Sequence, residues 1–259
     1  SASAILATIA DERVLAPLIT ALRSSDWIVR MHAASALGRV RNADAVEPLI
    51  PLLHDKVKAV RDEAATALAA IGDAAISSLL KALQHEDWLV RLHAVESLGK
   101  AHSKRAVEPL LSVLFNDHDS VVREDAVRAL GEIGDPQVIE HLFTVMREPG
   151  LRTVAVEVLG QIGDPRAVPV LIDVVTGASS PEVTRTVASC GEHWNEEAIT
   201  QGAAARALGA IGDERAIPPL VASLDQTHTR AEAAASLAKF GSKVIPFLLP
   251  LLNEPRDEN

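Results

Sequence analysis

The sequence predicts an all-α fold, a right-handed α-solenoid built from about seven two-helix repeats. The first observation is a near-repetition, because Asp87–Gly99 (DWLVRLHAVESLG) matches Asp26–Gly38 (DWIVRMHAASALG) 61 positions earlier. The second is a period, because Leu-Gly or Leu-Ala pairs recur at steps of 29 to 32 residues, apart from one step of 49. A helix-sized unit that returns every ~30 residues is typical of a helical solenoid. These pairs begin at Leu37, Leu68, Leu98, Leu130, Leu159, Leu208 and Leu237.

The second helix of each repeat is predicted from an apolar stripe. Apolar residues recur at i, i+4 and i+8, which places them on one face of an α-helix. Asp26, Asp87 and Asp119 stand just before three of these helices, so we expect their side chains to be N-caps that accept hydrogen bonds from backbone N–H groups. The stripes are Val29, Ala33, Leu37; Val60, Ala64, Leu68; Val90, Ala94, Leu98; Val122, Ala126, Leu130; and Leu151, Ala155, Leu159.

The first helix of each repeat carries a proline near its start, and an Ile-Gly-Asp link precedes several of these helices. Pro48 and Pro109 fall in the first turn, where a missing backbone N–H costs little. The glycine of each link, such as Gly134 or Gly163, allows the left-handed conformation that ends a helix. The Asp that follows is expected to cap the next helix. These glycines lack the spacing and the preceding strand of a phosphate-binding loop.

Composition disfavours several classes of function. The formal net charge of −10 opposes sequence-independent binding to nucleic acid and to anionic membranes, which both require a basic surface. Cys190 is the single cysteine, so an intramolecular disulfide is impossible, which suits a reducing compartment. No apolar run approaches the ~20 residues of a membrane helix, and Ser1–Ala10 does not resemble a signal peptide. We therefore expect a cytoplasmic protein that binds neither nucleic acid nor membranes.

The step of 49 residues marks an insertion at about 177–194, between the two helices of the sixth repeat. Ser180 and Pro181 are typical of a helix start and predict a short extra helix, and Asn195 is expected to cap the helix that follows. Insertions in repeat arrays often map to a binding face, so a partner-contacting loop and a structural filler both stay open. Two ligands in a Cys-x-x-His are too few for a metal site. The candidate loop residues are Cys190, Glu192, His193 and Trp194.

Polar side chains mark a candidate binding surface on the second helices. On a wheel of about 100° per residue, the face opposite the apolar stripe holds His93 and Glu96. The second helices of such solenoids line the concave side, which is the usual binding face. Each of the second helices of the first five repeats carries an arginine beside its apolar stripe, such as Arg91, which we call the repeat arginine. The position two residues after it, which we call the slot, holds an ionisable residue in four successive repeats. A solvated face without a partner is the alternative. The partner-binding residues predicted on the concave face are His32, Glu63, Thr66, His93, Glu96, Asp125 and Arg128.

The repeat arginines and two tryptophans have structural interpretations. Arg30 and Arg91 each follow an aspartate by four residues, the spacing of a same-face ion pair. We therefore expect an Asp/Arg ladder that stabilises the array, and no anion binding there. Trp27 and Trp88 occupy the first helical position after a cap. They either shield the turn between two helices or are exposed as anchors for a partner, since Trp is over-represented among interface hot spots.

Two motifs carry a resemblance to a known repeat family. Residues 122–131 read Val-Arg-x-x-Ala-x-x-x-Leu-Gly, and residues 162–171 read Ile-Gly-Asp-x-x-Ala-Val-x-x-Leu. Motifs and period together resemble the HEAT-like repeats of the phycobilisome-lyase type, which are found in E/F-type bilin lyases. The resemblance covers essentially the whole chain apart from the insertion. The resemblance implies a solenoid of about seven HEAT-like repeats. It also implies a bilin lyase subunit, a phycobilisome-associated factor or a scaffold without enzymatic activity. Some such lyases act as pairs of solenoid subunits.

Deoxyhypusine hydroxylase is similar in architecture and holds a di-iron site on His-Glu pairs of such helices. Neighbouring helices pack about 8–10 Å apart, so same-slot residues of adjacent repeats are expected to lie too far apart to share one ion. We therefore expect no metal site, and a hydroxylase is the least favoured function. An acidic chain also disfavours a HEAT-like DNA glycosylase, which needs a basic surface. The pairs at the corresponding positions are Met31-His32, Asp62-Glu63, Leu92-His93 and Glu124-Asp125, none of which is His-Glu.

We interpret the chain as a protein–protein interaction scaffold that binds another protein on its concave face, without catalytic residues and without a cofactor. The alternative is a bilin lyase or isomerase subunit, or a phycobilisome-associated factor, and then a bilin would bind. If the chain is an enzyme, we expect a lyase of the bilin-attachment type. A hetero-oligomer with a second solenoid subunit is a further expectation. Residues 1–259 are expected to form a single solenoid that ends in a polar tail at 253–259.

Overall fold

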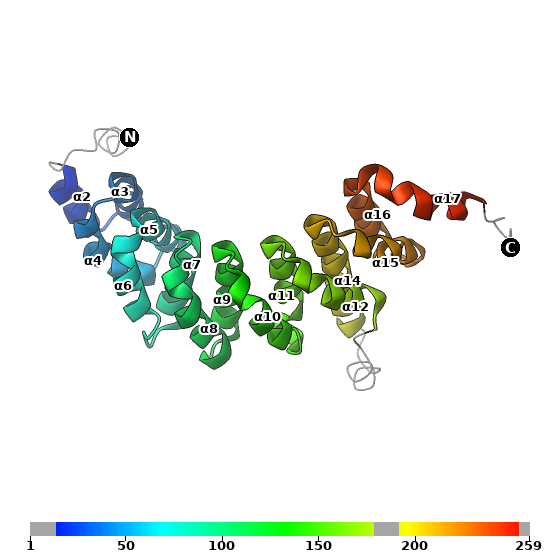
Figure 1. Cartoon of the computed structure of the whole chain (residues 1–259). Helices are drawn as coiled ribbons and strands as arrows, with labels where there is room; N and C mark the ends of the chain where they lie inside the picture. Colours follow the sequence, from blue (N-terminus) through cyan, green and yellow to red (C-terminus); the bar gives the residue numbers. More distant parts are fainter. Residues whose placement is uncertain (1–13, 179–191, 254–259) are drawn as a thin grey trace. The chain divides into compact units, whose positions relative to one another are not determined.

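The described part of the chain consists of helices and their connections. The computed structural model describes residues 14–178 and 192–253. Within these ranges the regular structure is α-helix and 3-10 helix, without strands. Successive helices form pairs, and within each compact unit the pairs stack on one another (Figure 1). The predicted all-α, solenoid-like fold is confirmed. None of the described helices is both long enough and apolar enough to cross a bilayer.

The chain divides into two compact units, which are described separately. Unit 1 comprises Ser1–Asp135 and unit 2 comprises Pro136–Asn259. The single continuous solenoid over residues 1–259 therefore stays a prediction.

Unit 1 contains four helix pairs in its described residues. In each pair the first helix leads through a short turn into the second, and the second helices α3, α5, α7 and α9 pack side by side (Figure 1). The second repeat begins with a short helix between two 3-10 turns. The elements are α2 (Leu15–Ala21), α3 (Trp27–Val40), η2 (Ala43–Ala45), α4 (Val46–Leu49), η3 (Ile50–His54), α5 (Lys58–Ile71), α6 (Asp73–Ala82), α7 (Trp88–Lys100), η4 (Lys104–Ala106), α8 (Val107–Asn116) and α9 (Ser120–Ile133).

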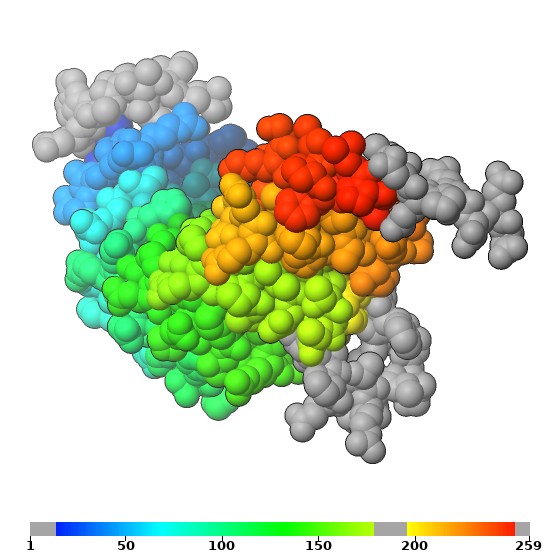
Figure 2. Space-filling view, turned by 45° about the vertical axis from the view of Figure 1, so that its right-hand side comes forward, coloured from blue at the N-terminus to red at the C-terminus, as the bar shows by residue number. Residues whose placement is uncertain are grey.

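Unit 2 contains three further pairs and a lone first helix in its described residues. That last helix, α17, exposes Ile245, Phe247 and Leu249 to solvent. The surfaces of α16 and α17 are drawn in orange to red in Figure 2. The elements are η5 (Pro136–Val138), α10 (Ile139–Val145), α11 (Pro149–Ile162), η6 (Pro165–Ala167), α12 (Val168–Thr176), α14 (Glu192–Ile211), η7 (Glu214–Ala216), α15 (Ile217–Ala222), η8 (Ser223–Asp225), α16 (Arg230–Lys239), η9 (Gly241–Val244) and α17 (Ile245–Asn253).

The insertion falls mostly outside the described residues. The predicted extra helix and Cys190 lie there. The following helix, α14, begins at Glu192, so the prediction that Asn195 caps it is wrong. Glu192, His193 and Trp194 form the first turn of α14, and their side chains lie outside what the structure describes.

The apolar stripes form the core of each unit. The stripe residues of α5, α7, α9 and α11 are all buried, as predicted. In α3, Ala33 and Leu37 are buried, but Val29 is 40% exposed, so the stripe prediction is wrong at that residue. The helix α3 packs against a second helix, α5, on only one side within the described residues, and Val29 lies in its first turn.

The glycines that mark the end of each repeat are points of close helix contact. A side-chain carbon on Gly38 of α3 would lie 2.8 Å from the Cα atom of Ala67 in α5. On Gly99 of α7 it would lie 2.8 Å from the Cα atom of Ala129 in α9. Backbones approach this closely only where a side chain is absent. Helix α5 has Ala69 at the equivalent position, so its contact with α7 lacks the glycine.

The predicted N-caps are confirmed. The side chains of Asp26, Asp87 and Asp119 accept hydrogen bonds from N–H groups two residues further on, at 2.9, 2.8 and 2.9 Å. Each satisfies a backbone donor that has no partner within the helix. Gly134 and Gly163 adopt positive φ angles of 68° and 75°, as predicted for the residues that end α9 and α11.

The aspartate of the Ile-Gly-Asp link caps only some of the first helices. Asp164 and Asp213 accept a hydrogen bond from the N–H group two residues on, at 2.8 and 2.9 Å. Asp73 does not, and the capping prediction is wrong there. Gly72 directly precedes α6, so Asp73 is already the first helical residue. Its carboxylate still lies in the first turn, where negative charge is favourable.

The arginine ladder exists, but its partners differ from the prediction. Arg30 forms a bidentate pair with Asp55, with Nε–Oδ2 and Nη2–Oδ1 distances of 2.7 and 2.9 Å. Arg91 forms the same pair with Asp117, at 2.7 and 2.9 Å. Both aspartates end the first helix of the following repeat. Arg30 and Arg91 therefore each tie one repeat to the next, while the aspartate four residues before each of them caps its own helix.

Candidate functional site

The predicted slot residues lie in the grooves between neighbouring second helices. His32, Glu63 and Asp125 are partly exposed, but His93 is 4% exposed, so its prediction as a surface residue is wrong. The second helices pack side by side, and a residue at this angle therefore meets the adjacent helix. Val154, at the same slot of α11, is buried for the same reason.

The remaining predicted residues are more accessible. Thr66 and Arg128 are exposed, as expected, and Glu96 is partly exposed. Arg128 forms an ion pair with Glu124, one turn earlier on α9.

His93 is the centre of a polar cluster between α5 and α7. Its Nε2 atom accepts a hydrogen bond from Arg61 Nε at 3.1 Å. Guanidinium N–H groups can only donate, so the ring proton must reside on Nδ1. Nδ1 lies 3.1 Å from Glu96 Oε2 and donates to it. Lys100 donates to the other carboxylate oxygen, Glu96 Oε1, at 2.6 Å. Sequence reasoning missed Arg61, because nothing in a single helix's spacing indicates a bond between two repeats.

Asp62 completes a convergent set of ligand-type atoms. One oxygen of Asp62, one nitrogen of His93 and one oxygen of Glu96 all lie within 4.8 Å of one another. The expectation that same-slot residues of adjacent repeats lie too far apart to share one ion is not tested by this set and stays a prediction. It compared only the same slot in each repeat, whereas Asp62 precedes the slot and Glu96 lies one turn after it. We call Asp62, His93 and Glu96 the α5–α7 cluster.

The pKa values of two carboxyl groups near this cluster are strongly perturbed. The hydrogen bond from His93 lowers the pKa of Glu96 to about 2, and Lys100 adds to the effect. Burial raises the pKa of Asp125 on α9 to about 6, and repulsion from the charged Glu96 adds to it. The Glu96 carboxylate is thus held ionised at all ordinary pH values, while that of Asp125 is disfavoured.

Replacing Asp125 with asparagine is expected to stabilise unit 1 at alkaline pH. The pKa of Asp125 is about 6 in the folded chain against an ordinary value of 3.8, so its charged form opposes folding. The penalty is absent below pH 3.8, develops as the pH rises and is complete above about 6. With a discount for partial exposure, we expect a gain of roughly 1–2 kcal/mol at pH 8.

Urea unfolding at pH 8 and pH 4 measures this gain, with a metal chelator present so that bound cations do not alter the local charge. Glu124→Gln, on the preceding residue, is the matched control. A loss of stability for Asp125→Asn at pH 8 would show that its carboxylate is favourable in the folded chain.

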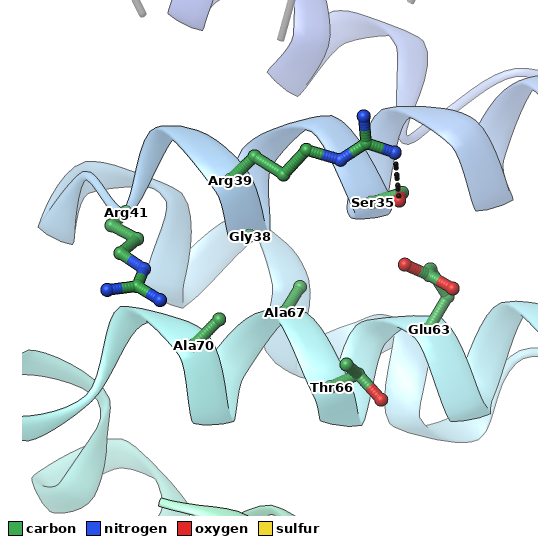
Figure 3. A pocket seen from close by; sticks show the side chains of 8 residues that line it. All are labelled: Ser35, Gly38, Arg39, Arg41, Glu63, Thr66, Ala67 and Ala70. Atoms are coloured by element: carbon green, nitrogen blue, oxygen red, sulfur yellow. Dashed lines mark hydrogen bonds between the residues drawn. The ribbon is translucent and has the colours of Figure 1, made fainter. Parts of the chain in front are cut away.

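A surface groove of about 430 Å³ lies between α3 and α5 (Figure 3). Its floor is formed by residues with little or no side chain. Figure 3 shows Arg39 and Arg41 on the α3 side and Glu63 on the α5 side. Lys100 Nζ donates to Thr66 Oγ1 at 3.3 Å, which links the groove to the α5–α7 cluster. The residues that line the groove are Ser35, Gly38, Arg39, Arg41, Glu63, Thr66, Ala67 and Ala70.

The two tryptophans are exposed at the starts of second helices. Trp27 and Trp88 are each 41% exposed at the starts of α3 and α7. Val121, in the first turn of α9, is also exposed. The starts of three second helices in unit 1 therefore present apolar surface.

Comparison with family models identifies the repeats. The model described as HEAT repeats matches residues 15–84, 76–154 and 193–259, which is most of the chain. The chain belongs to the HEAT-repeat family. Within this HEAT-repeat protein, residues 151–176 also match the PBS lyase HEAT-like repeat. The resemblance to phycobilisome-lyase repeats is thus confirmed.

Known relatives share parts of this HEAT-repeat protein. Deoxyhypusine hydroxylase-B from Oryza sativa is 37% identical over 79 residues, which cover 30% of the chain and 26% of the hydroxylase. The CpcE–CpcF complex of phycocyanin lyase from Nostoc is 23% identical, with 90% and 91% of the two chains covered and a TM-score of 0.46. Kap95p in its complex with RanGDP is 15% identical, with 93% and 39% covered and a TM-score of 0.62. The likeness to Kap95p shows the fold alone.

Proposed function

We propose that this HEAT-repeat protein is a scaffold that binds another protein through the second helices of unit 1. The observation that carries the proposal is the groove between α3 and α5. It is open to solvent, its floor is made of small residues and its rim is charged (Figure 3). Such a groove accepts side chains of a partner, whereas in the α5–α7 cluster His93 and Glu96 already bond to each other and Asp62 to Lys58.

The chemistry of the groove favours a partner segment that carries a carboxylate. Gly38 and Ala67 pack against each other at the bottom of the groove, and the short side chain of Ala70 keeps the space above them open. Within residues 14–178 and 192–253, Arg39 bonds only through Nη2, which donates to Ser35 Oγ at 3.2 Å, and its other guanidinium donors are left for a ligand. Arginine donors bind carboxylates in a bidentate geometry. Glu63 on the opposite wall would select a positive group on the same segment.

The experiment is an affinity capture of partners from native lysate with the wild-type chain and the double variant Arg39→Glu, Arg41→Glu. We expect recovery of the partner to fall at least ~10-fold with the variant, since charge reversal at a binding surface costs several kcal/mol. The matched control is Arg166→Glu, Arg215→Glu, which makes the same charge change in unit 2. Equal recovery with the groove variant and the wild type would rule out this groove as the contact.

A bilin lyase subunit or phycobilisome-associated factor is the second candidate. The match of residues 151–176 to the PBS lyase HEAT-like repeat favours it. On this reading the chain pairs with a second solenoid subunit and contacts a bilin. Titrating a free bilin, with and without a phycobiliprotein subunit, would shift the bilin absorbance. An unchanged spectrum in both titrations removes this candidate. Both candidates place the chain in the cytoplasm and require neither nucleic acid nor a membrane.

A further inference from the structure

We propose that Asp62, His93 and Glu96 bind one divalent transition-metal cation, such as Zn²⁺, and that this cation ties α5 to α7. The inference is independent of the scaffold proposal, since it concerns a different part of unit 1. The ligand set differs from the His-Glu pairs considered for a hydroxylase, and it implies neither a second ion nor a reaction.

The distances fit a shared cation. His93 Nδ1 and Glu96 Oε2 lie 3.1 Å apart. Zinc–nitrogen and zinc–oxygen bonds of about 2.0–2.2 Å place two ligands of one ion roughly 3 Å apart. An oxygen of Asp62 lies within 4.8 Å of a ring nitrogen of His93 and of an oxygen of Glu96, so a movement of the Asp62 side chain toward the ion would complete the ligand set. Three protein ligands from two helices leave a further position for water.

Burial and ligand type favour a transition metal. The side chain of His93 is 5% exposed, and that of Glu96 is 29% exposed. Asp62 is 41% exposed and provides the solvent-facing side of the site. One imidazole with two carboxylates suits zinc, iron or manganese, whereas calcium and magnesium prefer oxygen ligands alone.

Two lysines orient the carboxylates. Lys58 Nζ donates to Asp62 Oδ2 at 2.7 Å. Lys100 Nζ donates to Glu96 Oε1 at 2.6 Å, on the oxygen that does not face His93. Hydrogen bonds to the outer atoms of metal ligands fix their direction and raise affinity. Each carboxylate therefore keeps one oxygen for the cation.

Arg61 competes with the cation for His93. As long as Arg61 donates to Nε2, the ring proton stays on Nδ1, which then has no lone pair for a metal. Binding through Nδ1 requires the proton to move to Nε2 and the hydrogen bond from Arg61 Nε to break. Arg61 keeps its second bond, from Nη1 to the carbonyl oxygen of Asp55 at 2.8 Å. Removing the arginine should therefore tighten metal binding.

The test is a titration of the chelator-treated chain with ZnCl₂ against a chromophoric chelator. We expect one equivalent of Zn²⁺ to bind the wild type, with at least ~10-fold weaker binding to Asp62→Asn and to Glu96→Gln, as for the loss of one ligand or its support. Arg61→Gln should bind more tightly than the wild type. Glu63→Gln, beside Asp62 on α5, is the matched control and should bind like the wild type.

Thermal unfolding supplies a second readout that does not depend on the competing dye. Zn²⁺ should raise the Tm of the wild type, because a ligand that binds only the folded state stabilises it, and should not raise the Tm of Asp62→Asn. Circular dichroism confirms that the variants fold. Failure of the wild type to bind Zn²⁺ would overturn the proposed site. Binding by Asp62→Asn and Glu96→Gln that equals binding by the wild type would also overturn it and would mean an adventitious ion only. Equal affinity of Arg61→Gln and wild type would overturn the competition.

Discussion

Replacing Gly160 with valine is expected to destabilise unit 2 by about 3 kcal/mol, at the upper end of the range for overpacked helix contacts. Gly160 lies where α11 meets α14. A side-chain carbon at this position would lie 2.6 Å from Ala207 Cβ and 2.7 Å from Ala207 Cα. The second contact is with backbone, so no rotamer change relieves it and the two helices must move apart. The better helix propensity of valine recovers only ~0.4 kcal/mol.

The same helix offers a matched control. Gly150, in the first turn of α11, has nothing within 4 Å of the position where a side-chain carbon would be built. Gly150→Ala should therefore leave stability unchanged or raise it by up to ~1 kcal/mol through helix propensity. Urea unfolding followed by circular dichroism measures both variants. Unfolding of Gly160→Val at the wild-type midpoint would mean that α11 and α14 are less closely packed than the contact distances indicate.

Replacing Arg91 with alanine is expected to destabilise unit 1 by about 3 kcal/mol, the low end of the cost of breaking a buried ion pair. Arg91 and Asp117 are 14% and 6% exposed, and their bidentate pair joins the third repeat to the fourth. Arg91 Nη1 also donates to the carbonyl oxygens of His85 and Glu86, both at 2.9 Å. The variant leaves the Asp117 carboxylate without its partner. Arg91→Lys keeps the positive charge but loses the planar guanidinium group, so its stability should lie between those of the wild type and Arg91→Ala.

The destabilisation caused by Arg91→Ala should depend on pH in a defined direction. Burial alone would raise the pKa of Asp117, but hydrogen bonds from Arg91 and from the Asp119 N–H group outweigh it and hold that pKa below 3.8. A carboxyl group with a lowered pKa stabilises the fold above its unfolded value, and this contribution is lost as the pH falls through the folded value. The difference between wild type and Arg91→Ala should therefore be full at pH 7 and smaller below pH 3.8. A constant difference would contradict the ion pair as its source.

The sequence was sufficient to predict what depends on one helix at a time. The helical period revealed the apolar stripes, and a polar residue before each stripe identified Asp26, Asp87 and Asp119 as caps. It failed where two repeats meet. The spacing of four residues suggested that Arg91 pairs with the aspartate before it, because a pattern along one helix cannot show that the next repeat brings Asp117 closer. For the same reason His93 was expected on the surface.

The candidate site was predictable only in part. Glu63, Thr66, His93 and Glu96 were identified as polar positions on second helices, and the structure brings two of them to the groove and two to the α5–α7 cluster. Their partners across the repeat boundary were not identified, since the sequence pattern places Arg61 and Asp62 among ordinary charged residues of a helix surface. A helical wheel gives one direction for each residue, whereas the cluster depends on how far two helices are shifted along each other.

The missing glycine contact between α5 and α7 gives unit 1 an uneven resistance to local opening. In a stacked array, the interface that contributes least decides where the structure opens first. The α3–α5 and α7–α9 interfaces each have a glycine against an alanine, a contact that salt does not affect. The α5–α7 interface relies in part on hydrogen bonds from the charged side chains of Arg61 and Lys100 to His93 and Thr66, and electrostatic attractions of this kind weaken as ionic strength rises. We therefore expect the amide protons of unit 1 to exchange first at the boundary of its second and third repeats.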